Sequence, residues 1–227
     1  MNEKLWNVFL SLQGNDENTP VTNKEIVRPF NLTYKILNEL DVFNYFNIKE
    51  YNKILIIGAG DGAEVFSFKI RGYDTIGITW HNSDKKYAEI NYKINLLIED
   101  MHNMKSIQSE SFDGIYSYHV LEHSIAPLIA LYEMRRVLKD KGKILCVVPL
   151  VGTDNETGLQ HYSVLRNEHW KHLLNLIGFD NIEITKLNGR YVKDSILIKA
   201  IKGNRDCPGT YFDKEFIKEE NQIYESI

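Results

Sequence analysis

The feature that most constrains the fold is the alternation, from Lys53 onward, of short apolar runs with longer mixed segments. Runs of strand length separated by segments of helix length are typical of βα units around a mostly parallel sheet. The pattern therefore predicts an α/β fold with strands over Lys53–Gly58, Thr75–Thr79, Ile94–Ile98, Phe112–Ser117, Gly142–Val148, Asn181–Leu187 and Tyr191–Ile201.

The segments between these runs predict helices over Ala63–Ile70, Asp84–Tyr92, Ile125–Leu138 and Leu165–Ile177. Gly178 is expected to end the last of them, because glycine readily takes the left-handed conformation that closes a helix. Asn188-Gly189 is a turn dipeptide, so the two strands on either side of it are expected to form an antiparallel hairpin.

The length of 227 residues fits one domain with terminal additions. Residues 1–50 include a helical pattern through Phe30, Tyr34 and Leu37, which predicts an N-terminal helical cap that serves as a substrate lid. We expect the core to span residues 51–202, followed by a charged tail over residues 203–227.

Composition excludes several classes of protein. The 27 Lys and Arg residues against 31 Asp and Glu residues give a net charge of −4, which disfavours bulk binding to nucleic acid. Cys146 and Cys207 form no CxxC pair, which fits a reducing cytoplasm. No apolar run approaches the ~20 residues that span a bilayer, so no membrane association is expected.

A glycine-rich segment, Gly58-Ala59-Gly60-Asp61-Gly62, joins the first predicted strand to the first helix of the core. Glycines there let a ligand approach the backbone, and the N-terminus of the helix adds N–H donors. The loop alone fits either a nucleotide-like ligand or a tight turn. Its G-x-G-x-G spacing differs from the G-x-G-x-x-G fingerprint of dinucleotide-binding proteins, which argues against an NAD-dependent oxidoreductase.

Three further motifs follow in order: Glu99-Asp100-Met101, the segment 111–123 that ends in Val-Leu-Glu-His, and the segment 136–145. With the glycine loop, they make residues 50–200 resemble class I methyltransferases that depend on S-adenosylmethionine (SAM). The resemblance implies a Rossmann-like three-layer sandwich, with a seven-stranded, mostly parallel sheet whose last strand is antiparallel. It also implies SAM as the cofactor, with Gly58, Ala59, Gly60 and Gly62 under its methionine and ribose, Asp100 on the adenine amino group and Met101 beside the ring.

The second strand departs from the family pattern, because Thr79 stands where an acidic residue usually binds the ribose hydroxyls. Thr79 offers a single hydroxyl, so Asn82, Ser83 or Asp84 at the start of the next helix are candidates for additional ribose contacts. Trp80 either covers the adenine or fills the core.

Methyl transfer often requires a base that removes a proton from the acceptor, and His119, His123 and His161 are the candidates for catalysis. His161 is our preferred base, His119 is expected to contact SAM or substrate, and His123 acts in catalysis or fixes the loop. His119 to His123 also match the H-x-x-E-H spacing of a zinc peptidase helix, but Val-Leu-Glu-His is frequent in these methyltransferases. A second hypothesis is that two or three of the four histidines His81, His119, His123 and His161, together with Glu122, hold a divalent metal.

The sequence thus predicts a methyltransferase for a small-molecule acceptor, with oxygen as the acceptor atom. The segment 77–88 resembles methyltransferases of bacterial surface-polysaccharide pathways, which implies a sugar or a phosphorylated or anionic intermediate as the acceptor. A protein- or RNA-directed methyltransferase and a non-catalytic SAM-binding partner protein remain alternatives. The sequence gives no indication of the oligomeric state.

Overall fold

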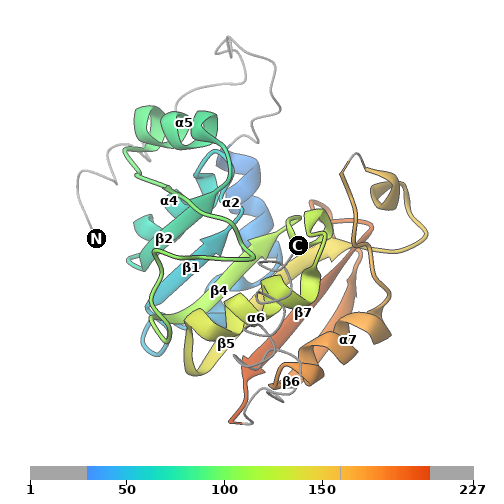
Figure 1. The fold of residues 1–227 in the computed structure, drawn as a ribbon. Helices are drawn as coiled ribbons and strands as arrows, with labels where there is room; N and C mark the ends of the chain where they lie inside the picture. The colour runs from blue at the N-terminus through green and yellow to red at the C-terminus, as the bar shows by residue number, and fades with distance from the viewer. Residues whose placement is uncertain (1–29, 159, 205–227) are drawn as a thin grey trace, which may run out of the picture.

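The computed structural model describes residues 30–158 and 160–204 and shows one twisted sheet between two layers of helices (Figure 1). The strand order is β3-β2-β1-β4-β5-β7-β6, and β7 runs antiparallel to both of its neighbours. The other pairings are parallel, which confirms the predicted Rossmann-like fold. The strands are β1 Lys53–Ile57, β2 Asp74–Thr79, β3 Leu97–Ile98, β4 Phe112–Tyr118, β5 Leu138–Pro149, β6 Phe179–Leu187 and β7 Ser195–Lys202.

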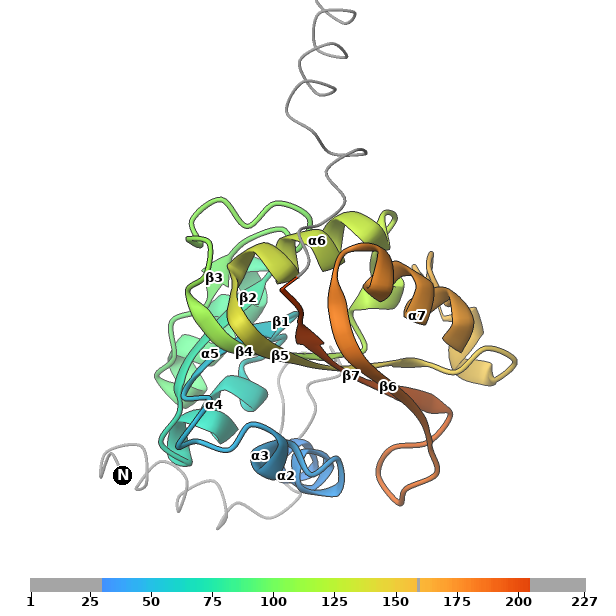
Figure 2. The same ribbon diagram turned by 90° about the horizontal axis from the view of Figure 1, so that it is seen from below.

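Helices cover both faces of this sheet (Figure 2). Four of them, α2 to α5, lie on one face, and α6 and α7 lie on the other. The helices are α2 Phe30–Glu39, α3 Val42–Tyr45, α4 Ala63–Ile70, α5 Asn82–Tyr92, α6 Pro127–Val137 and α7 Asn167–Leu176, with the short 3-10 helices η1 Leu121–His123 and η2 Asp154–Thr157.

The uninterrupted apolar sequence of β1 is explained by its burial on both faces of the sheet. Ile54 and Ile56 pack into the hydrophobic cluster on the side of α4, whereas Leu55 and Ile57 pack into the cluster on the side of α6. Successive side chains of a strand point to opposite faces, so a central strand with helices on both sides is apolar at every position. All four side chains are at most 1% exposed.

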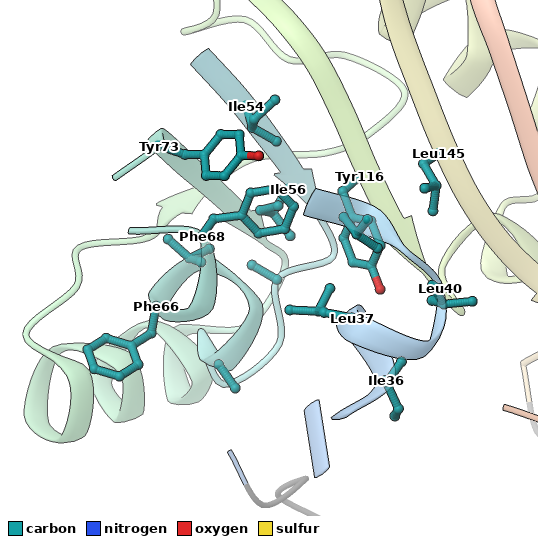
Figure 3. Close-up of a cluster of buried hydrophobic side chains, with 14 of the residues drawn as sticks. Ile36, Leu37, Leu40, Ile54, Ile56, Phe66, Phe68, Tyr73, Tyr116 and Leu145 are labelled. Carbon is teal, nitrogen blue, oxygen red and sulfur yellow. The ribbon is translucent and has the colours of Figure 1, made fainter. Parts of the chain in front are cut away.

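The described part of the predicted N-terminal cap belongs to the helical layer beside α4. Ile36 and Leu37 of α2 are buried with Phe66 and Phe68 of α4 in one cluster, which Figure 3 shows. Phe30 adds an edge-to-face contact with Phe66 at a centroid distance of 5.3 Å. Residues 1–29 lie outside the described part of the chain, so their action as a lid stays a prediction.

Two predicted strands are shorter than expected. The predicted strand 94–98 pairs with β2 only at Leu97 and Ile98. Ile94 and Leu96 are buried, but in the cluster on the side of α4 rather than in a strand ladder. The last strand was expected from residue 191, yet β7 begins at Ser195.

The carboxylate of Glu39 explains the late start of β7. It accepts hydrogen bonds from the backbone N–H groups of Arg190, Tyr191 and Val192 at 3.0–3.1 Å. These donors are therefore used by α2 rather than by a strand ladder, and the hairpin between β6 and β7 has a longer loop than the Asn188-Gly189 pair predicts.

Several other elements also have boundaries that differ from the predicted ones, among them β5, which begins at Leu138 rather than at residue 142. The helix expected to end at residue 138 ends at Val137, because Leu138 already pairs with Phe112 at the start of β5. Strand β6 begins two residues early, at Phe179, and contains an irregularity where Asn181 has a φ of 50°. Gly178 has a φ of 83° after α7, as predicted for the residue that ends this helix.

Within the described residues, no helix has the length and apolar character needed to cross a membrane. The tail from residue 205 onward lies outside them.

Candidate functional site

The glycine loop leaves the carboxyl end of β1 and enters α4. Gly58, Gly60 and Gly62 have φ values of 67°, 47° and 90°, in the left-handed region that glycine adopts without steric cost. Ala59 between them is fully buried and donates its N–H to the carbonyl of Ile78 at 2.8 Å. The loop is therefore fixed to the neighbouring strand β2.

The three glycines have different surroundings. A Cβ atom on Gly58 would collide with the side chain of Val120, and one on Gly62 would lie 2.8 Å from Cβ of Ala88. A Cβ atom on Gly60 would meet no atom within 4 Å. Gly58 and Gly62 thus permit close packing, whereas Gly60 faces open space where a ligand can approach the backbone.

Asp100 follows β3 and is half-exposed, with 46% of its side chain accessible. Its Oδ1 accepts a hydrogen bond from the backbone N–H of His102 at 2.9 Å and lies 2.7 Å from Nδ1 of the same residue. Nε2 of His102 lies 2.6 Å from Oγ of Ser124. His102 is thus a positioning residue for Asp100, and no motif in the sequence had indicated it.

Trp80 lies beside Asp100 at the edge of the sheet. It is 66% exposed, so it is not the core residue that one interpretation of the sequence allowed. It lines a cavity of about 430 Å³ together with Ile98, Glu99, Asp100, Asn103 and Lys105. An exposed indole beside a carboxylate suits a flat ring that carries an amino group. Met101 is partly buried against the cluster on the side of α6.

Thr79, at the carboxyl end of β2, is 4% exposed and donates its hydroxyl to Oδ2 of Asp84 at 2.8 Å. Asp84 lies in the first turn of α5 and is partly buried. A carboxylate therefore does stand beside the end of β2, although the helix supplies it rather than the strand. Asn82 and Ser83, the other candidates, have exposed side chains.

His119 follows the carboxyl end of β4 with a φ of 52°, in the left-handed region that side chains rarely adopt. Its backbone N–H donates to the carbonyl of Val147 in β5. The ring lies between two polar groups, with Nε2 3.1 Å from Oγ of Ser195 and Nδ1 3.1 Å from Oε1 of Glu122. His119 is thus held at the carboxyl end of β4, by contacts with β5, with Ser195 at the start of β7 and with Glu122.

Two of the candidate histidines, His123 and His161, lie next to each other near Glu122. The rings of His123 and His161 meet edge to face at a centroid distance of 4.8 Å. The side chains of Glu122, His123 and His161 each offer one ligand atom, and these atoms lie within 4.8 Å of one another. We call these three residues the acceptor-side cluster. His81 directly precedes α5 and does not belong to this cluster.

Backbone hydrogen bonds bring His161 to this position although it is 38 residues from His123. The N–H groups of Tyr162 and Ser163 both donate to the carbonyl of Glu122, at 2.8 and 2.9 Å. Oγ of Ser163 donates to the carbonyl of Ser124 at 2.6 Å. The segment after β5 is therefore fixed to the η1 turn after β4, and Val120 at the start of that turn contacts the glycine loop.

An ion pair on α6 fixes the segment that follows Asp100. Glu133 accepts from the backbone N–H of Met104 at 2.9 Å, and Arg136 donates to the carbonyls of Met104 and Ile107. Burial alone would raise the pKa of Glu133, but the hydrogen bonds from Arg136 and Met104 outweigh it and lower that pKa. The carboxylate is therefore stabilised in its charged form.

Comparison with known proteins identifies a domain within this chain. Residues 55–146 match the family model described as a methyltransferase domain, and this range includes the glycine loop, Thr79, Asp100 and the η1 turn. A SAM-dependent methyltransferase from Archaeoglobus fulgidus has a similar structure, with a TM-score of 0.64 and 20% identity over 76% of this chain and 94% of the other.

A protein from Pyrococcus horikoshii is similar to the same degree, with a TM-score of 0.64 and 17% identity over 82% of this chain and 96% of the other. The chain thus carries a methyltransferase domain in the fold of SAM-dependent methyltransferases. A search of curated proteins also found a ribosomal protein, uL5c of Euglena longa, 27% identical over 58% of this chain and 87% of its own length. At that identity, the likeness does not assign the chain to the ribosomal family.

The residues present fit SAM, the methyl donor that such a domain implies. Open space at Gly60 admits a ligand to the backbone, and Asp84 and Asp100 place carboxylates at the ends of neighbouring strands. The exposed Trp80 supplies an aromatic face beside Asp100. When bound, SAM supplies an electrophilic methyl group on sulfur, and the protein aligns the acceptor with it.

Proposed function

We propose that this protein transfers the methyl group of SAM to an oxygen atom of a small-molecule acceptor. The observation that carries the proposal is the open space at Gly60, between the carboxylate side chains that follow β2 and β3 and the imidazoles that follow β4 and β5. Ligands of open α/β sheets bind beyond the carboxyl ends of the strands, where the strand order reverses, and here it reverses between β1 and β4.

The cofactor side of this proposal uses residues that follow β1, β2 and β3. Gly60 would lie under the ligand, Asp84 with Thr79 would accept hydrogen bonds from the ribose hydroxyls, and Asp100 would accept one from the adenine amino group. Trp80 would lie against the adenine ring.

The acceptor side uses residues that follow β4 and β5. His119 and the acceptor-side cluster offer imidazoles and one carboxylate beside the glycine loop. A general base at this place would remove the proton of an acceptor hydroxyl. A bound cation would favour loss of that proton, or would hold an oxygen that is already anionic in position. This chemistry supports an oxygen acceptor, such as a sugar or a phosphorylated intermediate.

The resemblance of the segment 77–88 to polysaccharide-pathway methyltransferases bears on the cofactor rather than on the acceptor. The segment includes the end of β2, Trp80 and the first half of α5, all on the adenine and ribose side. A role in surface-polysaccharide synthesis in the cytoplasm therefore remains a proposal that rests on sequence likeness alone.

The test is to measure the release of S-adenosylhomocysteine, the demethylated product, from SAM in three parallel screens. These contain hydroxyl-bearing and anionic sugars, total RNA, and total protein. We expect turnover with a small hydroxylated acceptor. Turnover with RNA or protein only would contradict the proposal, and binding of SAM without turnover in any screen would favour a non-catalytic SAM-binding protein.

A further inference from the structure

Glu122 places a carboxylate in the interior of the protein. It is fully buried, and neither of its carboxylate oxygens has a hydrogen-bond partner among the described residues. Nδ1 of His119 approaches Oε1 at 3.1 Å but without the geometry of a hydrogen bond, and Oε2 has no such neighbour. A buried carboxylate that accepts no hydrogen bond is costly, so a missing ligand is the natural explanation.

The two histidines of the acceptor-side cluster supply what a cation needs in addition to a carboxylate. Nδ1 of His123 lies 3.0 Å from the carbonyl oxygen of Gln160. A carbonyl can only accept, so this contact makes Nδ1 the protonated nitrogen and leaves Nε2 as a lone-pair donor. Histidines that bind metals usually donate their second ring N–H to a carbonyl or carboxylate in this way.

We propose that Glu122, His123 and His161 bind a divalent transition-metal ion, which holds an oxygen of the methyl acceptor. Two imidazoles and one carboxylate favour zinc, manganese or iron over magnesium, which prefers oxygen ligands alone. The three ligand atoms lie within 4.8 Å of one another, and ligands of one ion about 2.1 Å away are at most about 4.2 Å apart. A small rotation of the side chains would therefore close the site.

The position of the acceptor-side cluster would allow the bound ion to hold an acceptor oxygen beside the proposed SAM site. Three protein ligands leave coordination positions open for water or an acceptor oxygen. The exposure of the cluster runs from buried Glu122 to exposed His123, so an ion and an acceptor can enter from solvent. Val120, two residues before Glu122, contacts the glycine loop, which places this site next to the proposed SAM site. The proposal deepens the proposed function and rests on it for the acceptor.

The experiment is a calorimetric titration of the chelator-treated, full-length protein with Zn²⁺, and separately with Mg²⁺. We expect one Zn²⁺ per chain and little affinity for Mg²⁺. Glu122→Gln keeps the shape of the side chain and removes its charge, and His161→Ala removes one imidazole from a loop. Each should weaken Zn²⁺ binding at least tenfold, whereas His169→Ala, at an exposed position on α7, should leave it unchanged.

SAM affinity measured on the same variants separates the two proposals. If SAM binds normally and Zn²⁺ does not, or if Zn²⁺ binds both variants as it binds the wild type, the metal site is wrong while the proposed function stands. If SAM does not bind the wild-type protein, the proposed function fails. His161→Ala keeps the test decisive if Glu122→Gln does not fold, because His161 is only partly buried.

Discussion

Replacing Asp100 by alanine is expected to weaken SAM binding by about 1–3 kcal/mol, the usual cost of leaving a polar partner without its hydrogen bond. Since 1.4 kcal/mol is a tenfold change, the Kd should rise roughly 5- to 150-fold. Oδ1 of Asp100 is already held by the backbone N–H and the ring of His102. The carboxylate is therefore in place before the ligand arrives, and the loss should fall near the middle of this range.

The assay is isothermal titration calorimetry of SAM with wild type, Asp100→Ala and a control. Asp74→Ala is a matched control, because Asp74 is an exposed aspartate at the opposite end of β2. The control should bind SAM as the wild type does. An Asp100→Ala protein that is folded and binds SAM with unchanged affinity would refute the placement of adenine beside Trp80.

Three further predictions follow from the site and its surroundings. In calorimetry, Asp84→Ala should weaken the binding of SAM more than Thr79→Ala does, because Thr79→Ala leaves the carboxylate of Asp84 in place. Thr79→Ala should also weaken SAM binding less than Asp100→Ala does. Glu133→Gln should lower the unfolding free energy by about 1–3 kcal/mol. The pKa of Glu133 is lower in the folded state than in the unfolded state. The stability difference between wild type and Glu133→Gln should therefore be complete above the unfolded pKa of about 4.3 and disappear as the pH falls through the folded pKa. Denaturant titrations at several pH values would measure it. Burial raises the pKa of the Cys146 thiol to about 12, so a thiol reagent at pH 8 should modify it only after unfolding.

The hydrophobic pattern of the sequence predicted those helices and strands whose boundaries are set by their own residues. The apolar run of β1, the pattern of α4 and Gly178 after α7 are local signals of this kind, and the structure confirms them. The start of β7 could not be predicted, because Glu39, over 150 residues away, binds the N–H groups that would have continued the strand. Local sequence contains no sign of such a distant contact.

The same distinction applies to the candidate site. The glycine loop is a contiguous motif, and the structure shows the open space that a ligand requires at Gly60. Asp84 was one of three candidates, and the structure distinguishes it by its partial burial and by the hydrogen bond from Thr79. His102 carries no motif, and its place between Asp100 and Ser124 depends on the fold of two separate loops.

The central claim is that SAM binds at the glycine loop, and Gly60→Val tests it most directly. A Cβ atom at this position would meet no protein atom within 4 Å, although a φ of 47° costs a non-glycine residue roughly 1–2 kcal/mol, so the protein should still fold. Titration with SAM and with NAD is the measurement. The wild type should bind SAM with micromolar affinity and show no comparable affinity for NAD, and folded Gly60→Val should bind neither. Unchanged SAM affinity in that variant, or a preference of the wild type for NAD, would contradict the claim.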